Sequence, residues 1–134
     1  MAMKSVAGVV CYVKDLGRTL DFYKKLGFKI DRDDPEHLSI ELYSFWIDFH
    51  PQDKEDKPDF QREAILEPKG AGLFLYIKVN DIDEFYEEAL AKGLKPSNKP
   101  KDWPWGNREF ALRDPDGYKL VFFQKNKLLQ QNDS

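Results

Sequence analysis

Two polar side chains in one short segment are the first candidates for chemistry in this sequence. Asp48 and His50 stand two positions apart in an apolar stretch, so on a strand they share a face. Such a pair suits a metal ion or an acid–base dyad. The chain has only one other histidine, His37, which we expect at an exposed strand start. A three-ligand site would need Glu41 or Glu109, so we expect Asp48 to contact a ligand and His50 to lie at the surface.

Aromatic side chains form the second group of candidates, at 14% of the residues. Trp103 and Trp105 flank a proline in a polar segment, where they either plug an edge of the core or stack on a ligand, because an exposed indole is costly unless something covers it. Trp46 is either core filler or part of a cavity wall. Glu109 either faces solvent or, like Arg108, orients a ligand in a crevice.

Nucleophilic catalysis, nucleic-acid binding and membrane binding find no support in the sequence. Cys11 is the only cysteine and lies in an apolar run, which predicts a buried structural thiol, and no Ser–His–Asp pattern is present. The formal charge of −3 comes without a basic stripe or polybasic tract. No stretch reaches the length of a membrane span, and the MAMKSVAGVV start lacks a separate hydrophobic segment, so we expect a cytoplasmic protein.

The elements that must position these residues form a duplicated pattern. A strand, a helix-capping aspartate, a helical apolar stripe and a stopping glycine occur twice, 66 positions apart. The offset relates Val13 to Val79, Asp15 to Asp81 and Gly27 to Gly93, and Glu84 completes a capping box in the second copy. The expected strands of the two copies are 5–13, 28–30, 37–42 and 45–49, then 73–79, 94–96, 108–113 and 118–124.

This pattern predicts an α+β fold of two tandem βαβββ modules that form a concave mixed sheet. In a single domain of 134 residues, module one covers 5–50, a charged linker covers 51–72 and module two covers 73–125. The linker has room for a short strand at 63–66. Each helix can cover one sheet face only, so the opposite face is left to line a cavity.

The chain resembles the vicinal oxygen chelate superfamily of glyoxalases, dioxygenases and bleomycin resistance proteins. The segments VKDLGRTLDFYKKLGF, VNDIDEFYEEALAKG and DPDGYKLVFF carry the resemblance, which covers nearly the whole chain. It implies metal-ligand places at Gly8, Asp48, Phe74 and Val121. Three of these residues offer no side-chain donor, so we expect no metal and no cofactor.

Within the superfamily, PWGNREFALRDPDG looks most like the bleomycin resistance proteins, apart from one extra residue, Asn107. The resemblance implies a homodimer that sequesters a small aromatic or amphiphilic molecule, such as a bleomycin-like antibiotic, with Trp105 at the mouth of the crevice. The alternatives are a metal-dependent lyase or dioxygenase, and a module with a closed cavity that acts through protein contacts. The residues expected to bind the ligand are Tyr12, Trp46, Asp48, Phe74, Tyr76, Trp103, Trp105, Arg108, Glu109, Val121 and Phe123.

Overall fold

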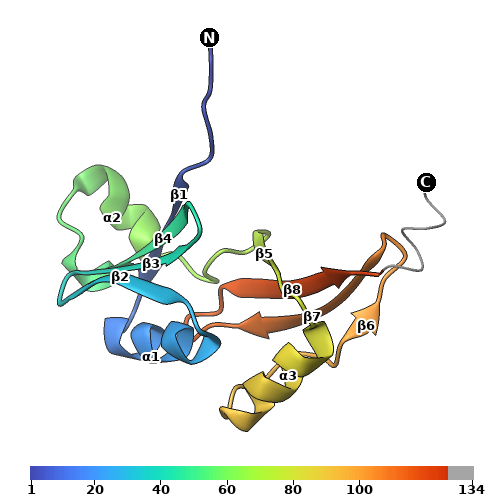
Figure 1. Ribbon diagram of the computed structural model, residues 1–134. Helices are drawn as coiled ribbons and strands as arrows, with labels where there is room; N and C mark the ends of the chain where they lie inside the picture. Colours follow the sequence, from blue (N-terminus) through green and yellow to red (C-terminus); the bar gives the residue numbers. More distant parts are fainter. Residues whose placement is uncertain (127–134) are drawn as a thin grey trace. The chain divides into compact units, whose positions relative to one another are not determined.

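The computed structural model describes residues 1–126 and divides into two compact units, Met1–Lys69 and a second unit that begins at Gly70. Each unit contains one four-stranded mixed sheet and a helix packed on it (Figure 1). The predicted α+β class with two βαβββ modules is therefore confirmed.

The first unit runs β1 (Gly8–Val13), α1 (Leu16–Leu26), β2 (Lys29–Asp34), β3 (His37–Leu42) and β4 (Phe45–Pro51). The strand order is β1-β4-β3-β2, in which β1 and β4 are parallel and the other pairs are antiparallel. This order brings the last strand of the unit against its first, so residues of β1 and β4 share one sheet face.

Helix α1 begins and ends where the sequence predicts. Asp15 caps it by accepting a hydrogen bond from the Arg18 amide at 3.1 Å, which satisfies a donor that the first turn leaves free. Gly27 ends it at φ 95°, a left-handed conformation that favours glycine. The apolar face of the helix packs on β3 and β4. The large apolar side chains that are fully buried in this unit are Val13, Tyr23, Leu38, Ile40 and Phe49.

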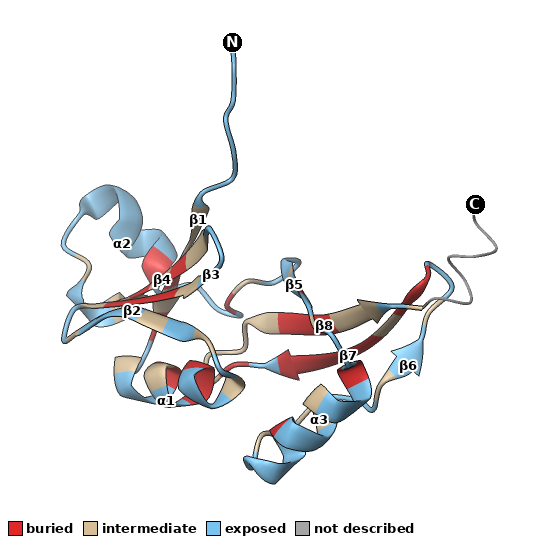
Figure 2. Ribbon diagram, viewed as in Figure 1, coloured by how far each residue is buried: buried red, intermediate tan, exposed pale blue. Residues whose placement is uncertain are grey.

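The second unit repeats the arrangement with β5 (Phe74–Lys78), α3 (Ile82–Ala91), β6 (Lys101–Asp102), β7 (Asn107–Arg113) and β8 (Lys119–Lys125). Its strand order is β5-β8-β7-β6, again with the first and last strands of the unit parallel. Buried residues concentrate on β7 and β8 (Figure 2).

Helix α3 is also capped by its predicted aspartate. Asp81 accepts from the Glu84 amide at 3.1 Å, and the side chain of Gln124 on β8 accepts from the Ile82 amide at 2.6 Å. Below the helix, the rings of Phe110 and Phe122 stack with centroids 5.4 Å apart. The fully buried side chains here are Ile82, Phe110, Leu112, Leu120 and Phe122.

Three expectations about the secondary structure are wrong. The segment 51–72 is more than a linker: it holds the end of β4, a 3-10 turn (Gln52–Lys54) and helix α2 (Pro58–Ala64). No strand forms at 63–66, where the sequence left room for one, and the helix ends within that range. Only Ala64 of this helix is buried, so no apolar stripe marks it in the sequence. No strand forms at 94–96, and the edge strand of the second sheet is β6 instead. Strand β2 continues to Asp34 through a register shift between Ile30 and Arg32.

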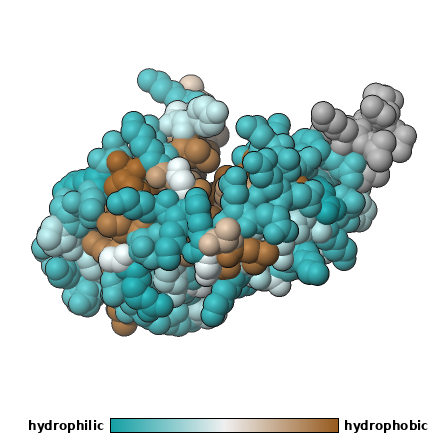
Figure 3. All heavy atoms as spheres, turned by 60° about the horizontal axis from the view of Figure 1, so that its bottom comes forward, coloured by the Kyte–Doolittle hydropathy of each residue, from teal (hydrophilic) through white to brown (hydrophobic). Residues whose placement is uncertain are grey.

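The surface shown in Figure 3 is mostly hydrophilic, with separate hydrophobic patches. Exposed large apolar residues include Val10, Phe74, Tyr76 and Trp105. Within residues 1–126, no helix is both long enough and apolar enough to cross a membrane.

Candidate functional site

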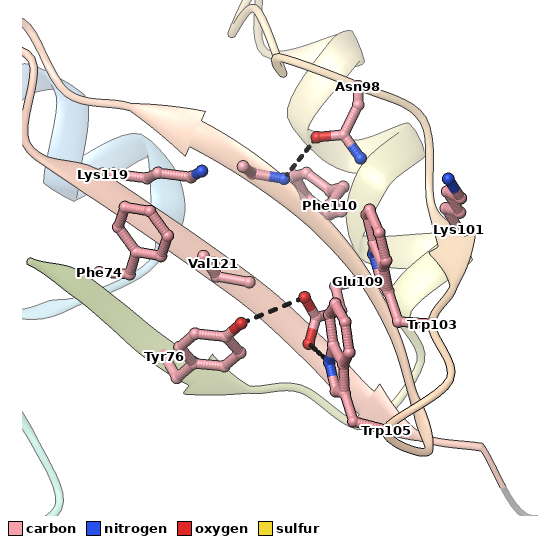
Figure 4. Close-up of a pocket in the computed structure, with 11 residues that line it drawn as sticks. Phe74, Tyr76, Asn98, Lys101, Trp103, Trp105, Glu109, Phe110, Lys119 and Val121 are labelled. Carbon is pink, nitrogen blue, oxygen red and sulfur yellow. Dashed lines mark hydrogen bonds between the residues drawn. The ribbon is translucent and has the colours of Figure 1, made fainter. Parts of the chain in front are cut away.

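The second unit contains a pocket of about 430 Å³. Its floor comes from strands β5, β7 and β8, and its wall comes from the segment that leads through β6 to β7 (Figure 4). Its volume falls in the range of sites for small organic ligands. The lining residues are Phe74, Tyr76, Asn98, Lys101, Trp103, Trp105, Glu109, Phe110, Ala111, Lys119 and Val121.

Glu109 is the polar centre of this pocket. Its side chain points into the pocket and is only 5% exposed, so the solvent-facing alternative is wrong (Figure 4). One carboxylate oxygen accepts from Trp105 Nε1 at 3.0 Å and from Asn107 Nδ2 at 3.1 Å, and the other accepts from the Tyr76 hydroxyl at 3.3 Å. A buried carboxylate needs such partners to offset its desolvation. The pKa of Tyr76 is raised, first by burial and then by the charge and hydrogen bond of Glu109.

The two tryptophans form an aromatic wall. Their ring centroids lie 4.8 Å apart with an interplanar angle of 10°, so the indoles stack (Figure 4). Gly106, at φ 90°, makes the tight turn that follows, and its amide donates to the Trp103 carbonyl at 3.1 Å. Trp105 stays 55% exposed, which leaves indole surface available to a planar guest.

Two lysines contact aromatic faces of the same pocket. The ammonium of Lys101 lies 4.3 Å from the ring centroid of Trp103, and that of Lys119 lies 4.0 Å from the ring centroid of Phe74. Both are cation–π interactions that join an exposed residue to a half-buried one, and each contributes about 0.5–1 kcal/mol. The ring faces of Trp103 and Phe74 are therefore each in contact with a lysine ammonium group in the free protein.

Six of the eleven residues expected to bind a ligand line this pocket: Phe74, Tyr76, Trp103, Trp105, Glu109 and Val121. Phe123 lies beside it, with its ring centroid 5.7 Å from that of Tyr76. Arg108 does not line it, because its guanidinium pairs with Asp83 at 2.9 Å and with Asp102 at 3.4 Å.

Strand alternation also placed Lys119 on the cavity-facing side of its strand, together with Val121 and Phe123, and Lys119 lines the pocket. Sequence reasoning left four lining residues unassigned: Asn98, Lys101, Phe110 and Ala111. The sequence carries no signal for Asn98, since it belongs to a loop and is held by the Ala111 amide, which donates to its side-chain oxygen at 3.0 Å.

The remaining three expected residues lie in the first unit. Trp46 pairs in register with Gly8, Asp48 with Val10, and Tyr12 with His50. Asp48 accepts from the Ser39 hydroxyl at 2.6 Å, and the hydroxyl of Tyr12 donates to Glu55. His37 begins strand β3, as expected, but it is half-buried rather than exposed, and its ring stacks on that of His50.

The four places at which the resemblance implies metal ligands do not fit a chelated ion. A β-carbon on Gly8 would overlap the indole and the carbonyl oxygen of Trp46, so that place is filled by an aromatic ring. Phe74 and Val121 present hydrocarbon to the pocket. Only Asp48 offers a donor, whereas a divalent ion needs three or four.

Replacing Gly8 with alanine is expected to destabilise the protein by about 1–3 kcal/mol, because the new methyl group forces Trp46 out of its position. Urea unfolding measures the change. Gly17→Ala is the matched control: at that exposed helical position the nearest atom to a β-carbon is an Asp15 oxygen at 3.2 Å, and alanine favours the helix by about 0.5–1 kcal/mol. Equal stability of the two variants would contradict the packing of Trp46 over Gly8.

Tyr12 is expected to ionise late. Burial first, and then the hydrogen bond and charge of Glu55, raise its pKa from 10.0 to about 12. Because the native state holds this proton more tightly than the unfolded state, the stability that it contributes is complete below pH 10.0 and is lost as the pH rises to about 12. An absorbance titration of tyrosinate should show a step at about pH 12 that Tyr12→Phe removes and that Glu55→Gln moves to lower pH. A step at about pH 12 that persists in the Tyr12→Phe variant would refute its assignment to Tyr12.

Each βαβββ unit is an open mixed sheet with a helix packed on it, and the strand order is the same in both units. This arrangement defines a class of paired-module α+β proteins. Comparison with protein families makes the identification specific. Residues 5–122 match the model of the Glyoxalase/Bleomycin resistance protein/Dioxygenase superfamily. The chain belongs to this superfamily, as the sequence segments predict.

Curated proteins and solved structures provide further similarities. A bleomycin resistance protein from Geobacillus stearothermophilus is 42% identical over 52 residues, which are 38% of this chain and 39% of that protein's length. A bleomycin-binding protein solved in complex with bleomycin has a TM-score of 0.65 at 24% identity, over 91% of this chain and 99% of the other. A hypothetical protein from S. aureus has a TM-score of 0.73 at 21% identity, over 92% and 95%. These structural matches establish the fold.

Proposed function

We propose that this protein binds and sequesters a small planar aromatic or amphiphilic molecule in the pocket of its second unit, without transforming it. The observation that carries the proposal is the stacked pair Trp103 and Trp105, held beside a buried, fully hydrogen-bonded Glu109. Aromatic stacking contributes about 0.5–1.5 kcal/mol beyond the burial of area. A flat heteroaromatic such as a bithiazole suits this wall.

The polar groups of the pocket favour binding over catalysis. Glu109 already accepts from three donors, which suits a group that fixes the aromatic wall rather than one that takes a proton from a guest. The lining holds no serine, cysteine or histidine. The ligand place at Val121 offers only an isopropyl group, so the proposed binding uses no metal ion in this pocket.

A closed-cavity module that acts through protein contacts is disfavoured, because an open pocket lies beside Tyr76 and Trp105. The metal-dependent lyase or dioxygenase is disfavoured by the missing donors at Gly8, Phe74 and Val121. The bleomycin resistance protein and the bleomycin-binding protein among the relatives make a bleomycin-like antibiotic the first ligand to try.

We further propose a cytoplasmic homodimer. Within residues 1–126, strands β1 and β5 are each paired on one side only. Val10 on β1 is exposed, as are Phe74 and Tyr76 on β5. Unpaired strand edges and exposed apolar side chains of this kind are commonly covered by a second copy of the chain in a homodimer. Light scattering of the untagged chain measures the oligomeric state.

Titration of tryptophan fluorescence with metal-free bleomycin tests the proposed binding. Two of the three tryptophans line the pocket, so a bound planar group should quench or shift the emission in a saturable way. A planar cationic dye, titrated in parallel, separates selectivity for the drug from general binding of flat cations. No saturable change at micromolar bleomycin would remove the drug from the proposal. No change with either probe would contradict ligand binding in this pocket.

A further inference from the structure

We propose that His37, Asp48 and His50 form a binding site for one divalent transition-metal ion such as Zn²⁺ in the first unit. This site goes beyond the aromatic pocket and does not rest on it. The nitrogen and oxygen atoms that the three side chains offer all lie within 4.8 Å of one another.

The pairing of β3 with β4 creates the cluster. Leu38 pairs with Phe49 in the antiparallel register, which sets the neighbouring residues His37 and His50 side by side. Their rings stack with centroids 4.6 Å apart and an interplanar angle of 29°. Asp48 projects from the same face of β4 as His50, and its Oδ2 lies 3.0 Å from His37 Nε2.

The contact between His37 and Asp48 is close but badly aimed. Nε2 of His37 is buried and makes no hydrogen bond of acceptable geometry within the part of the chain that the structure describes, although the carboxylate oxygen is at hydrogen-bonding distance. A buried ring nitrogen without a hydrogen bond is costly. A cation held between this nitrogen and the carboxylate oxygen would satisfy both atoms at once.

The surroundings of the cluster suit a metal site. Ser39 donates to Asp48 Oδ1 at 2.6 Å, which fixes the carboxylate and leaves Oδ2 for the ion, as outer-shell partners do in metal proteins. The side chains of His37 and Asp48 are 19% and 20% exposed, so the cluster is largely dehydrated yet open to an entering ion.

The donor set selects the class of ion. Two imidazole nitrogens and one carboxylate oxygen suit Zn²⁺, Ni²⁺ or Co²⁺, whereas Mg²⁺ and Ca²⁺ prefer oxygen ligands alone. Donor atoms around one zinc ion lie roughly 3–4 Å apart, so small rotations of the rings close the set. Of the three residues, only Asp48 occupies a place at which the family resemblance implies a ligand.

The test uses the fact that the chain has two histidines and both belong to the cluster. NMR spectra of the imidazole groups, recorded on the untagged protein during addition of zinc chloride, should show both histidines shifting and saturating at one equivalent. Magnesium chloride should move neither. Asp48→Asn should weaken zinc binding more than about 100-fold, and Ser39→Ala about 10–100-fold.

Asp31→Asn is the matched control, since it removes one exposed carboxylate from the same sheet and should leave zinc binding unchanged. If Asp48→Asn fails to fold, His50→Gln replaces it, because this variant keeps the Ser39–Asp48 hydrogen bond. Zinc that leaves both imidazoles unmoved, or that binds equally well to the ligand variants, would overturn the proposal. Bleomycin binding in the aromatic pocket is measured separately, so either result stands without the other.

Discussion

Replacing Trp105 with alanine is expected to weaken the binding of a planar ligand by more than about tenfold, which corresponds to about 1.4 kcal/mol. The side chain is 55% exposed in the free protein, so a stacked guest gains both buried area and ring contact there. Trp105→Phe should fall between the wild type and the alanine variant, because it keeps an aromatic face but loses the 3.0 Å hydrogen bond from Nε1 to Glu109. Isothermal titration calorimetry with metal-free bleomycin measures the three affinities.

Tyr43→Ala provides the control for a lost exposed aromatic ring. Tyr43 is 93% exposed in the turn between β3 and β4, and its replacement should leave the affinity unchanged. Equal affinities of the Trp105→Ala variant and the wild type would remove Trp105 from the binding wall.

Replacing Glu109 with leucine is expected to lower the free energy of unfolding by about 2–4 kcal/mol, the second large effect. The variant leaves Asn107 Nδ2 and the hydroxyl of Tyr76 without their acceptor, and it releases the indole of Trp105. Ligand affinity should fall with it, since the wall then lacks its support. Urea unfolding and calorimetry measure the two effects on the same protein.

Glu109→Gln is the matched variant for shape. An amide oxygen can still accept hydrogen bonds, so we expect a loss of about 1 kcal/mol or less. A leucine variant as stable as the wild type would mean that the desolvation of the buried carboxylate outweighs its hydrogen bonds. In that case Glu109 would not be what holds the aromatic wall in place.

Much of the fold was predictable because its signals are local and occur twice. Asp15 and Asp81 are each followed by a helical stripe, and both accept from the amide three residues on, as the capping rule requires. The repeat then fixes which strands correspond in the two units. Helix α2 escaped prediction because only Ala64 is buried, and a short, charged helix has no periodic apolar signal.

The pocket was predictable only in part, for a related reason. Strand alternation placed Phe74, Tyr76 and Val121 on one face, since the direction of a side chain follows from its position along a strand. It left open whether Glu109 faced solvent, because that depends on donors outside its own strand, the Tyr76 hydroxyl on β5 and the Trp105 indole in the preceding loop. The cluster of His37 with Asp48 and His50 was missed for the same reason: it depends on the register between β3 and β4.

At three of the places where the superfamily resemblance implies metal ligands, this protein has residues without a side-chain donor. Trp46 fills the space beside Gly8, and Phe74 and Val121 line an aromatic pocket. The first unit brings His37, Asp48 and His50 together, and of these three only Asp48 stands at a place where the resemblance implies a ligand. We therefore expect organic ligands and metal ions to be bound by different sets of residues in this protein.

NMR of the indole N–H groups during a titration with metal-free bleomycin tests the central claim most directly. We predict that the signals of Trp103 and Trp105 shift in a saturable way, with the dissociation constant that calorimetry gives for the same sample. Binding that leaves both signals unchanged, or no binding at all at micromolar bleomycin, would contradict a drug-binding site built on these two indoles.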